Sequence, residues 1–206
     1  MSFSNYKSVS TILQEFQITY QEENFITPAP FNISPLFQED LEIVMGYGVV
    51  DNSEFAICEN LIYPILKEVW KAYRDTFILW SHQSLTYNEK LSEFPEYILA
   101  KRSPLGRIVF GKPYLLLVEA KQDKFDEGWG QCLAEMVAAS RLNQEPKLTV
   151  FGIVSNGKIW QFGKLEGEQF TRSPIFYLIQ NLGELFGAVN YVFQQCQVQV
   201  NFLAVA

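Results

Sequence analysis

Hydrophobic residues in the first quarter of the chain recur every three or four positions, which is the spacing of a helix. Over residues 6–23 they predict a helix with one polar face. The run Thr27-Pro28-Ala29-Pro30 is expected to end this helix, because proline cannot continue one. A second, shorter helix is predicted over 34–45.

A long helix is predicted from Ser53 to about Arg74. Asn52 and Ser53 offer an N-cap, and Pro64 is expected to kink the helix. Glu59 lies on the flank of its apolar stripe, not on the opposite face. The residues of that stripe are Phe55, Cys58, Ile62, Ile65, Leu66, Val69 and Tyr73.

After Asp75 the period changes from that of helices to that of strands. The segments 76–82 and 97–100 predict strands, and a third over 108–110 is expected to pair with the second. Residues 114–118 form a continuous apolar run, as expected for a central strand that is covered on both faces.

The sequence that follows this apolar run predicts a helix, a hairpin and a further helix. The first helix is expected over 126–142. Strands over 148–154 and 158–162 flank Asn156-Gly157, a strong hairpin signal. An amphipathic helix is then predicted over 177–193.

This order of elements predicts one α/β domain over 1–206, with a mixed sheet and helices on its faces. We divide it into a helical extension over 1–52, a core over 53–165, and a C-terminal helix and tail over 166–206. Within that tail, the alternation over 197–202 indicates an edge strand.

Composition narrows the class of protein. Of 206 residues, 48% are hydrophobic, which supports a sizeable core and excludes a disordered chain. No apolar stretch approaches the roughly 18 residues of a membrane helix, and a secretory signal is lacking. We therefore expect no membrane partner. The three cysteines fit neither zinc nor disulfide spacing, so they are interpreted as buried hydrophobes in a reducing cytoplasm.

Charge bears on nucleic-acid binding. The net charge of −7 disfavours an independent DNA-binding protein, because such binding rests on surplus lysine and arginine. Residues 101–112 are richer in lysine and arginine than the rest of the chain. This stretch could be the solvated rim of a hairpin or an edge that contacts DNA phosphates, and both interpretations remain open. Its basic residues are Lys101, Arg102, Arg107 and Lys112.

Candidate chemistry gathers at the end of the apolar strand. Glu119 and Lys121 are two residues apart, so a strand places both side chains on one side. A buried charge is costly unless it is paired or binds a metal ion. A plain ion pair and a divalent-cation site both meet this condition. Mg²⁺ needs one or two carboxylates, and the lysine could then stabilise the charge that develops during phosphodiester hydrolysis.

Further polar residues can approach this strand end. Glu96 begins the adjoining strand, Gln131 lies in the first turns of the next helix, and Glu59 lies on the long helix. Ordinary surface roles remain open for all three. His82 is the single histidine and no Gly-x-Ser-x-Gly motif is present, so serine hydrolase chemistry lacks its parts. We interpret His82 as a strand or loop residue.

Four segments carry a recognisable combination of motifs: Pro95–Leu99, Tyr114–Lys121, Trp129–Met136 and Gly152–Phe162. Together they resemble the PD-(D/E)XK nuclease superfamily, and most of all the branch that contains the amino-terminal domains of type I restriction subunits. The likeness covers roughly residues 53–165. It implies a restriction-endonuclease-like mixed sheet flanked by helices, with extra helices at the N-terminus.

The resemblance also implies a function, that of a Mg²⁺- or Mn²⁺-dependent phosphodiesterase that cleaves DNA. Glu96 and Glu119 would bind the metal ion, and Lys121 would serve catalysis. Gln131 and Glu59 would support the site, with Glu59 as a further metal ligand. The basic stretch would hold the DNA backbone near Glu119, while a protein partner or a second copy supplies specificity.

One residue departs from the family pattern. The first acid is usually aspartate, whereas this chain has Glu96. The extra methylene displaces the carboxylate, and the geometry of Mg²⁺ is demanding. Three hypotheses therefore stay open: an active nuclease, a catalytically weak or inactive accessory module that keeps the nuclease fold, and a purely structural α/β domain.

Overall fold

The computed structural model describes residues 3–203. Its helices are α1 (Val9–Phe16), α2 (Pro35–Tyr47), α3 (Glu54–Ile57), α4 (Tyr63–Tyr73), α5 (Phe125–Asn143) and α6 (Leu182–Leu203), with a 3₁₀ turn over Phe3–Asn5 and a π turn over Cys58–Ile62. Its strands are β1 (Thr19–Glu22), β2 (Phe77–Ser81), β3 (Leu85–Thr86), β4 (Ser92–Glu93), β5 (Tyr97–Lys101), β6 (Tyr114–Ala120), β7 (Thr149–Ser155), β8 (Ile159–Glu166), β9 (Gln169–Arg172) and β10 (Tyr177–Leu178).

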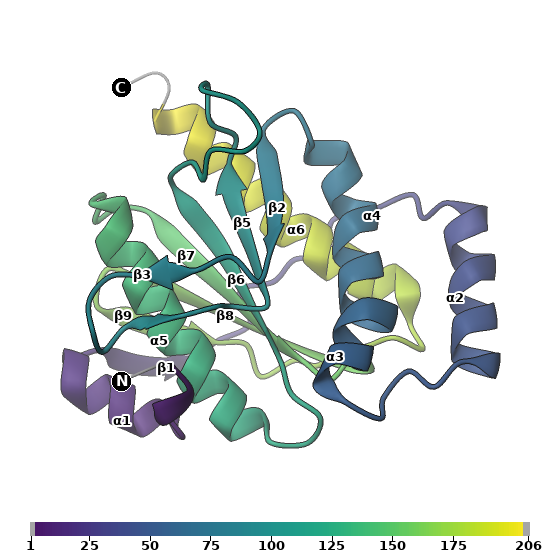
Figure 1. Ribbon diagram of the computed structural model, residues 1–206, viewed down its shortest axis with the longest axis horizontal. Coiled ribbons are helices and arrows are strands. Elements are labelled where there is room, and N and C mark those ends of the chain that lie inside the picture. Colours follow the sequence, from purple (N-terminus) through teal and green to yellow (C-terminus); the bar gives the residue numbers. More distant parts are fainter. Residues whose placement is uncertain (1–2, 204–206) are drawn as a thin grey trace.

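Eight of these strands form one mixed sheet (Figure 1). The order is β1-β9-β8-β7-β6-β5-β2, with β10 paired to β8. The pairs β1–β9 and β6–β7 are parallel, and the other pairs of this sheet are antiparallel. The parallel β6–β7 connection is made through α5, as a crossover requires. The prediction of an α/β protein with a mixed sheet flanked by helices is confirmed, and the sheet is largely antiparallel.

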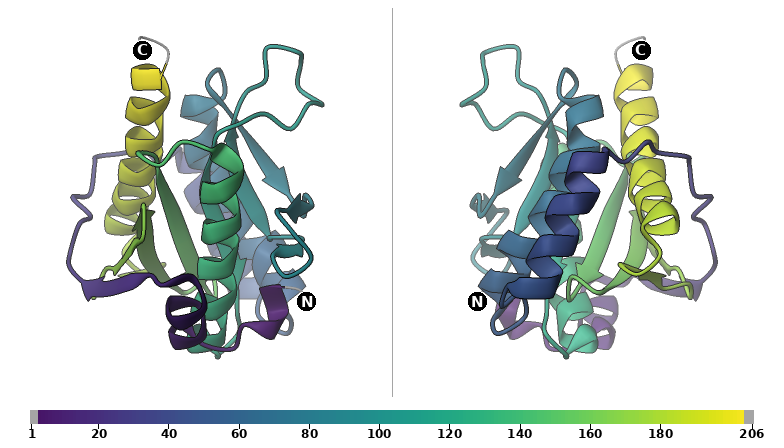
Figure 2. Two further views of the ribbon diagram at one scale, coloured as in Figure 1. Left: turned by 90° about the vertical axis from the view of Figure 1, so that its left-hand side faces the viewer. Right: turned by 90° about the vertical axis from the view of Figure 1, so that its right-hand side faces the viewer.

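Helices cover both faces of the sheet, so each face has its own hydrophobic core. Figure 2 shows α5 and α6 on opposite sides of the strands. The core on the α6 side includes Leu116 and Val118 of β6, whereas the core on the α5 side includes Leu117. Since side chains alternate along a strand, Glu119 and Lys121 project toward α5 as Leu117 does.

The long helix predicted from Ser53 is present, but it contains a π turn. Ser53 caps it, accepting a hydrogen bond from the Ala56 N–H at 3.1 Å. Pro64 has no N–H to donate to the carbonyl one turn earlier. The helical hydrogen bonds just before it shift by one residue, so that the Tyr63 N–H donates to the Cys58 carbonyl. The expected kink at Pro64 therefore takes the form of a π turn just before it.

The helix predicted over 6–23 is wrong in its second half. Helix α1 ends at Phe16, because Gln17 adopts the left-handed conformation (φ 57°) and the Ile18 N–H bonds back to Leu13. Residues Thr19–Glu22 instead form β1, parallel to β9. Long-range strand pairing has overridden a local helical pattern here.

Two further element predictions are wrong, and a third is wrong at its start. The segment 108–110 is no strand: it lies in a loop where Ile108 is 85% exposed, and β5 pairs directly with β6. The tail over 197–202 continues α6, because helical spacing buries Cys196 and Val200. The start of the helix predicted over 177–193 is β10 and a turn.

The predictions for the hairpin and for the burial of the cysteines are confirmed. The Asn156-Gly157 hairpin joins β7 to β8, with Gly157 at φ 79°. The described cysteines Cys58, Cys132 and Cys196 are buried and free. Among residues 3–203, none of the helices combines the length and apolar character needed to span a membrane.

Candidate functional site

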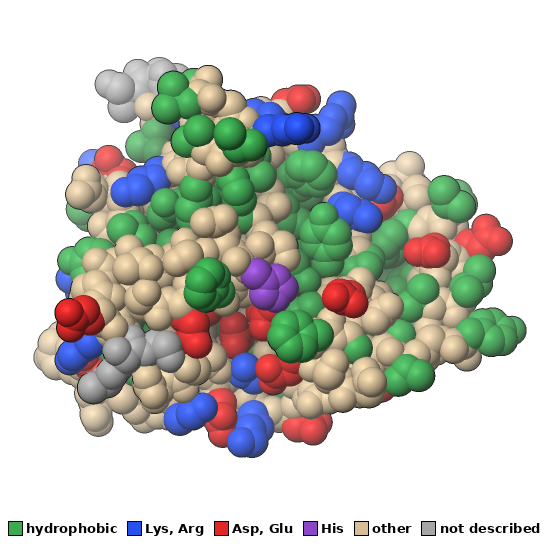
Figure 3. Space-filling model, in the orientation of Figure 1, with side chains coloured by type: hydrophobic (Ala, Val, Ile, Leu, Met, Phe, Trp, Pro, Cys, Tyr) green, Lys and Arg blue, Asp and Glu red, His purple; other side chains and the backbone are tan. Residues whose placement is uncertain are grey.

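The strand ends of β5 and β6 create the candidate site. These strands are antiparallel and Tyr97 pairs with Val118, so Glu96 and Glu119 are brought to the same end of the sheet. Glu96, Glu119, Lys121 and Gln131 all line one open cleft of about 580 Å³. Figure 3 shows acidic side chains gathered beside the single histidine on this face. The structure thus brings together four residues selected from the sequence.

Glu119 and Lys121 form an ion pair in this cleft. The Lys121 Nζ lies 2.9 Å from Oε1 of Glu119 and 3.5 Å from Oε2 of Glu54. Glu119 is only 4% exposed, and burial raises its pKa to about 7 although Lys121 acts to lower it. Burial alone would lower the pKa of Lys121, but the carboxylates of Glu119, Glu54 and Glu96 together outweigh this effect and the pKa is raised.

Helix α5 approaches this strand end very closely, and Gly128 makes that approach possible. A Cβ at position 128 would lie 2.8 Å from Cγ of Lys121 and 2.8 Å from Cγ1 of Val154. Gln131, three residues later, lies on nearly the same side of the helix and reaches the cleft. The glycine therefore sets the distance between the helix and the two catalytic candidates on the strand.

Glu96 is held by two neighbours. His82 Nε2 lies 2.7 Å from Oε2 of Glu96, and the Cys58 thiol donates to the same oxygen at 3.6 Å. Burial raises the pKa of Glu96, and the charge of His82 opposes this rise. His82 does follow β2 in a loop, but at φ 49°, a conformation that is uncommon for residues other than glycine. Sequence reasoning missed its contact with Glu96.

Helix α5 also contributes an acidic residue to the cleft, Glu135, which was not selected from the sequence. Glu135 is 2% exposed and lines the cleft. Its Oε2 has no hydrogen-bond partner among residues 3–203. Burial raises the pKa of Glu135 well above its usual range, and the next largest cause is the negative charge of Glu119. The available signal was its spacing of four residues from Gln131, which places both on one helix face.

Glu59 does not reach the cleft. Its side chain is exposed on the π turn, and it is not among the cleft-lining residues that the structure describes. Glu54 of α3 lines the cleft in its place. It precedes Cys58 by four residues and so shares the helix face that contacts Glu96. Glu93 of β4 also lines the cleft.

The basic stretch lies at the opposite end of β5 and β6. Lys101 ends β5 and Lys112 precedes β6, whereas Glu119 is near the end of β6. At 3.3 Å per residue, the separation from Tyr114 to Glu119 is about 16 Å. Arg102 donates to the Arg74 carbonyl and Lys112 to the Leu142 carbonyl. The expectation that Lys101, Arg102, Arg107 and Lys112 lie near Glu119 is therefore wrong, because antiparallel strands place their connecting loop at the far end.

Carboxylates of the cleft suit a hard divalent cation. Within residues 3–203, no three or more histidine, cysteine or acidic side chains are gathered so that they could hold a metal ion by themselves. Mg²⁺ commonly uses one or two carboxylates and keeps several waters. The ion pairs with Lys121 and His82 engage one oxygen each of Glu119 and Glu96. The donor set therefore fits a partly hydrated Mg²⁺ or Mn²⁺ ion.

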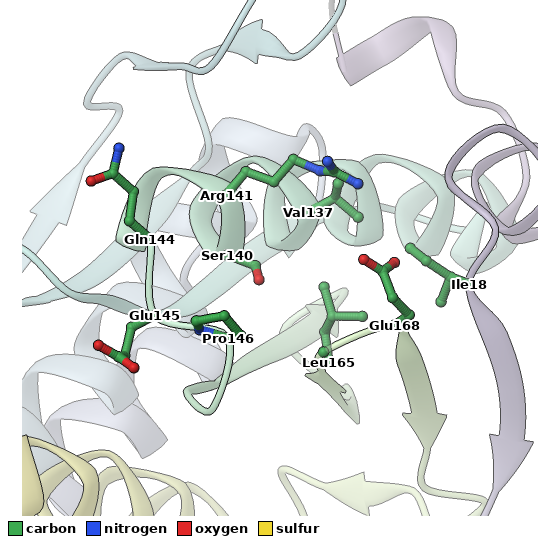
Figure 4. Close-up of a pocket in the computed structure, with 10 residues that line it drawn as sticks. Ile18, Val137, Ser140, Arg141, Gln144, Glu145, Pro146, Leu165 and Glu168 are labelled. Carbon is green, nitrogen blue, oxygen red and sulfur yellow. The ribbon is translucent and has the colours of Figure 1, made fainter.

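A second cavity, of about 240 Å³, lies near the other end of α5 (Figure 4). Figure 4 shows Gln144 and Glu145 directed away from Arg141 and Glu168. Its lining does not bring several acids together as the first cleft does. We therefore assign the candidate chemistry to the cleft at Glu119.

Comparison with known proteins adds no further assignment. A scan against protein-family models gives no match to this chain, and a search of curated proteins gives none either. The candidate site is accordingly defined by its residues and their geometry.

Proposed function

We propose that this protein is a metal-dependent phosphodiesterase of the PD-(D/E)XK type that cleaves DNA as one part of a larger system. The observation that carries the proposal is the gathering of Glu96, Glu119, Lys121 and Gln131 in one open cleft at adjacent strand ends. The proposal includes a restriction-endonuclease-like fold, which the mixed sheet with helices on both faces supports.

Each residue has a role that follows from its surroundings. Glu119 and Glu96 would hold the cation through their carboxylate oxygens. A bound Mg²⁺ or Mn²⁺ ion would supply charge neutralisation at the phosphate and activation of water. Lys121, whose raised pKa keeps it protonated, would stabilise the negative charge that develops on the phosphate. Gln131 would orient the attacking water with its amide.

The basic stretch has a separate place in this proposal. Because it lies at the far end of β5 and β6, it would not position the scissile phosphate. A duplex held at the cleft would need cations from elsewhere, since acids dominate the cleft lining. We therefore assign DNA recruitment to a protein partner or a second copy of the chain.

Specific observations favour one alternative, a catalytically weak or inactive accessory module with the same fold. His82 and Lys121 already bind the two acids, and both contacts compete with a cation for them. The acidic cleft also repels phosphate at low metal concentration. An accessory module would bind its protein or DNA partner through surfaces outside the cleft.

The proposal is tested by Mg²⁺- and Mn²⁺-dependent cleavage of supercoiled and single-stranded DNA at low salt. Lys121→Ala is compared with Lys90→Ala, which removes an exposed lysine that pairs with Glu15 instead. We expect metal-dependent nicking by the wild type and by Lys90→Ala, and none by Lys121→Ala. If the wild type neither nicks DNA nor binds Mn²⁺ in calorimetry, the nuclease proposal is wrong and the accessory module is favoured.

A further inference from the structure

Glu135 is the cleft residue whose burial has no explanation in the contacts described so far. It is 2% exposed, and its Oε2 meets no hydrogen-bond partner in the described part of the chain. A buried carboxyl oxygen without a partner is costly, and native proteins rarely keep one without a reason. The side chain lines the cleft that also holds Glu119 and Lys121.

The helix holds Glu135 rigidly in this position. Glu135 and Gln131 are four residues apart and both line the cleft, so one face of α5 presents them together. The absence of a side chain at Gly128 allows the same helix to pack closely against Lys121. Glu119 lines the same cleft from the end of β6 and is buried like Glu135. Two buried carboxylates therefore line one cleft, one from the strand and one from the helix.

One carboxylate oxygen of Glu96 is already engaged by two neighbours, unlike Oε2 of Glu135. The same oxygen of Glu96 is engaged by His82 at 2.7 Å and by the Cys58 thiol. A cation that bound through this oxygen would have to displace both contacts. An approach to Glu135 Oε2 requires no such displacement within the described residues.

We propose that Glu135 also binds the divalent cation held at Glu119, so that the helix supplies a further carboxylate ligand and waters complete the coordination. Two carboxylates with several waters are a common set for Mg²⁺. Two like charges that are buried together need such a cation more than an exposed pair does. This inference rests on the proposed function, and it names a ligand that the family resemblance does not imply.

The test measures Mn²⁺ binding by the full chain, with electron paramagnetic resonance of free Mn²⁺ as the readout. Glu135→Gln keeps the shape of the side chain and removes its ligating charge, and Glu119→Gln does the same on the strand. Glu93→Gln is the matched control, because Glu93 lines the same cleft and the substitution makes the same change in charge. We expect the dissociation constant to rise about tenfold or more for Glu119→Gln and Glu135→Gln, and to stay within about threefold for Glu93→Gln.

Several outcomes overturn the inference. Wild-type affinity in Glu135→Gln, with binding lost in Glu119→Gln, excludes Glu135 as a ligand but leaves the proposed function standing. An equal loss of Mn²⁺ affinity in Glu93→Gln would mean that the effect comes from the net charge of the cleft and not from coordination by Glu135. If the wild type binds no Mn²⁺, this inference and the metal-dependent function are both wrong. Should Glu135→Gln fail to fold by circular dichroism, Glu135→Asp keeps the charge but retracts the carboxylate, and unchanged Mn²⁺ affinity there contradicts the proposal.

Discussion

Lys121 and Glu119 lie on one face at the end of β6, with Nζ of the lysine 2.9 Å from Oε1 of the glutamate. Each compensates a charge that the other could not keep alone in so buried a position. Gly128 brings α5 against the same lysine. The pair is therefore a structural element of the strand end as well as the centre of the proposed site.

Lys121→Met is expected to destabilise the protein at high pH and not at low pH. Burial raises the pKa of Glu119 from its ordinary 4.5 to about 7, so the folded protein binds this proton more tightly than the unfolded chain and loses stability as pH rises through this window. Without Lys121 the ionised Glu119 has no cationic partner, so the loss of stability at about pH 8 should be larger by about 3 kcal/mol. Well below pH 4.5 the Glu119 carboxyl is protonated in both states, and the destabilisation caused by Lys121→Met should vanish. Urea denaturation at the two pH values measures it, and an equal loss at both contradicts the explanation.

Glu135→Gln is expected to stabilise the metal-free protein as pH rises. The pKa of Glu135 is raised well above its ordinary 4.5, chiefly by burial, so the unfolded chain releases this proton first and wild-type stability falls above that pH. Glutamine does not titrate. In a chelating buffer, the free energy of unfolding of the variant should exceed that of the wild type by on the order of 1–3 kcal/mol at about pH 8. Thermal unfolding across pH checks this, and parallel curves would show that Glu135 is not the titrating group.

Gly128→Ala is expected to destabilise the fold. Its Cβ would lie 2.8 Å from Cγ of Lys121 and from Cγ1 of Val154, so strand and helix must separate. Such overpacking costs about 1–3 kcal/mol. Gly183→Ala is the matched control, since no atom lies within 4 Å of its added Cβ and alanine favours a helix by about 1 kcal/mol. Chemical denaturation of both variants decides the matter: equal effects would disprove the close approach.

Gln17→Gly is expected to stabilise the protein. Gln17 ends α1 at φ 57°, a left-handed conformation that glycine adopts without steric cost. We expect a gain of about 0.5–1 kcal/mol in the free energy of unfolding. Gln14→Gly is the control, because the same change inside the exposed face of α1 should cost about 1 kcal/mol. A loss of stability in Gln17→Gly would mean that the side-chain bond from Gln17 to the Gln14 carbonyl outweighs the backbone effect.

The site residues that were predictable from sequence are those placed by regular local structure. Glu119 and Lys121 end a continuous apolar strand, and Glu96 begins the strand that pairs with it. Gln131 follows on the next helix. The position of the basic stretch also follows from the sequence, because a loop that connects two antiparallel strands must lie at the end away from Glu119.

Other features depend on partners that are distant in sequence. Glutamate in a helix usually faces solvent, so the burial of Glu135 becomes visible only when α5 packs on the sheet. The contact between His82 and Glu96 requires the pairing of β2 with β5. The polar segment Thr19–Glu22 becomes a strand only because β9 is beside it. These three features were missed because each depends on a packing or pairing partner that the local sequence pattern does not indicate.

The parallel pairing of β1 with β9 also bears on how the chain folds as it is synthesised. Gln21 contacts Thr171, 150 residues later. The ribosome therefore releases the edge strand long before its partner exists, and contacts of such large separation form slowly. Until β9 has emerged, Thr19–Glu22 has no sheet to join. Strand β1 leaves the ribosome well before β9 but docks only afterwards, and hydrogen exchange on stalled nascent chains should find it protected only after β9 has cleared the exit tunnel.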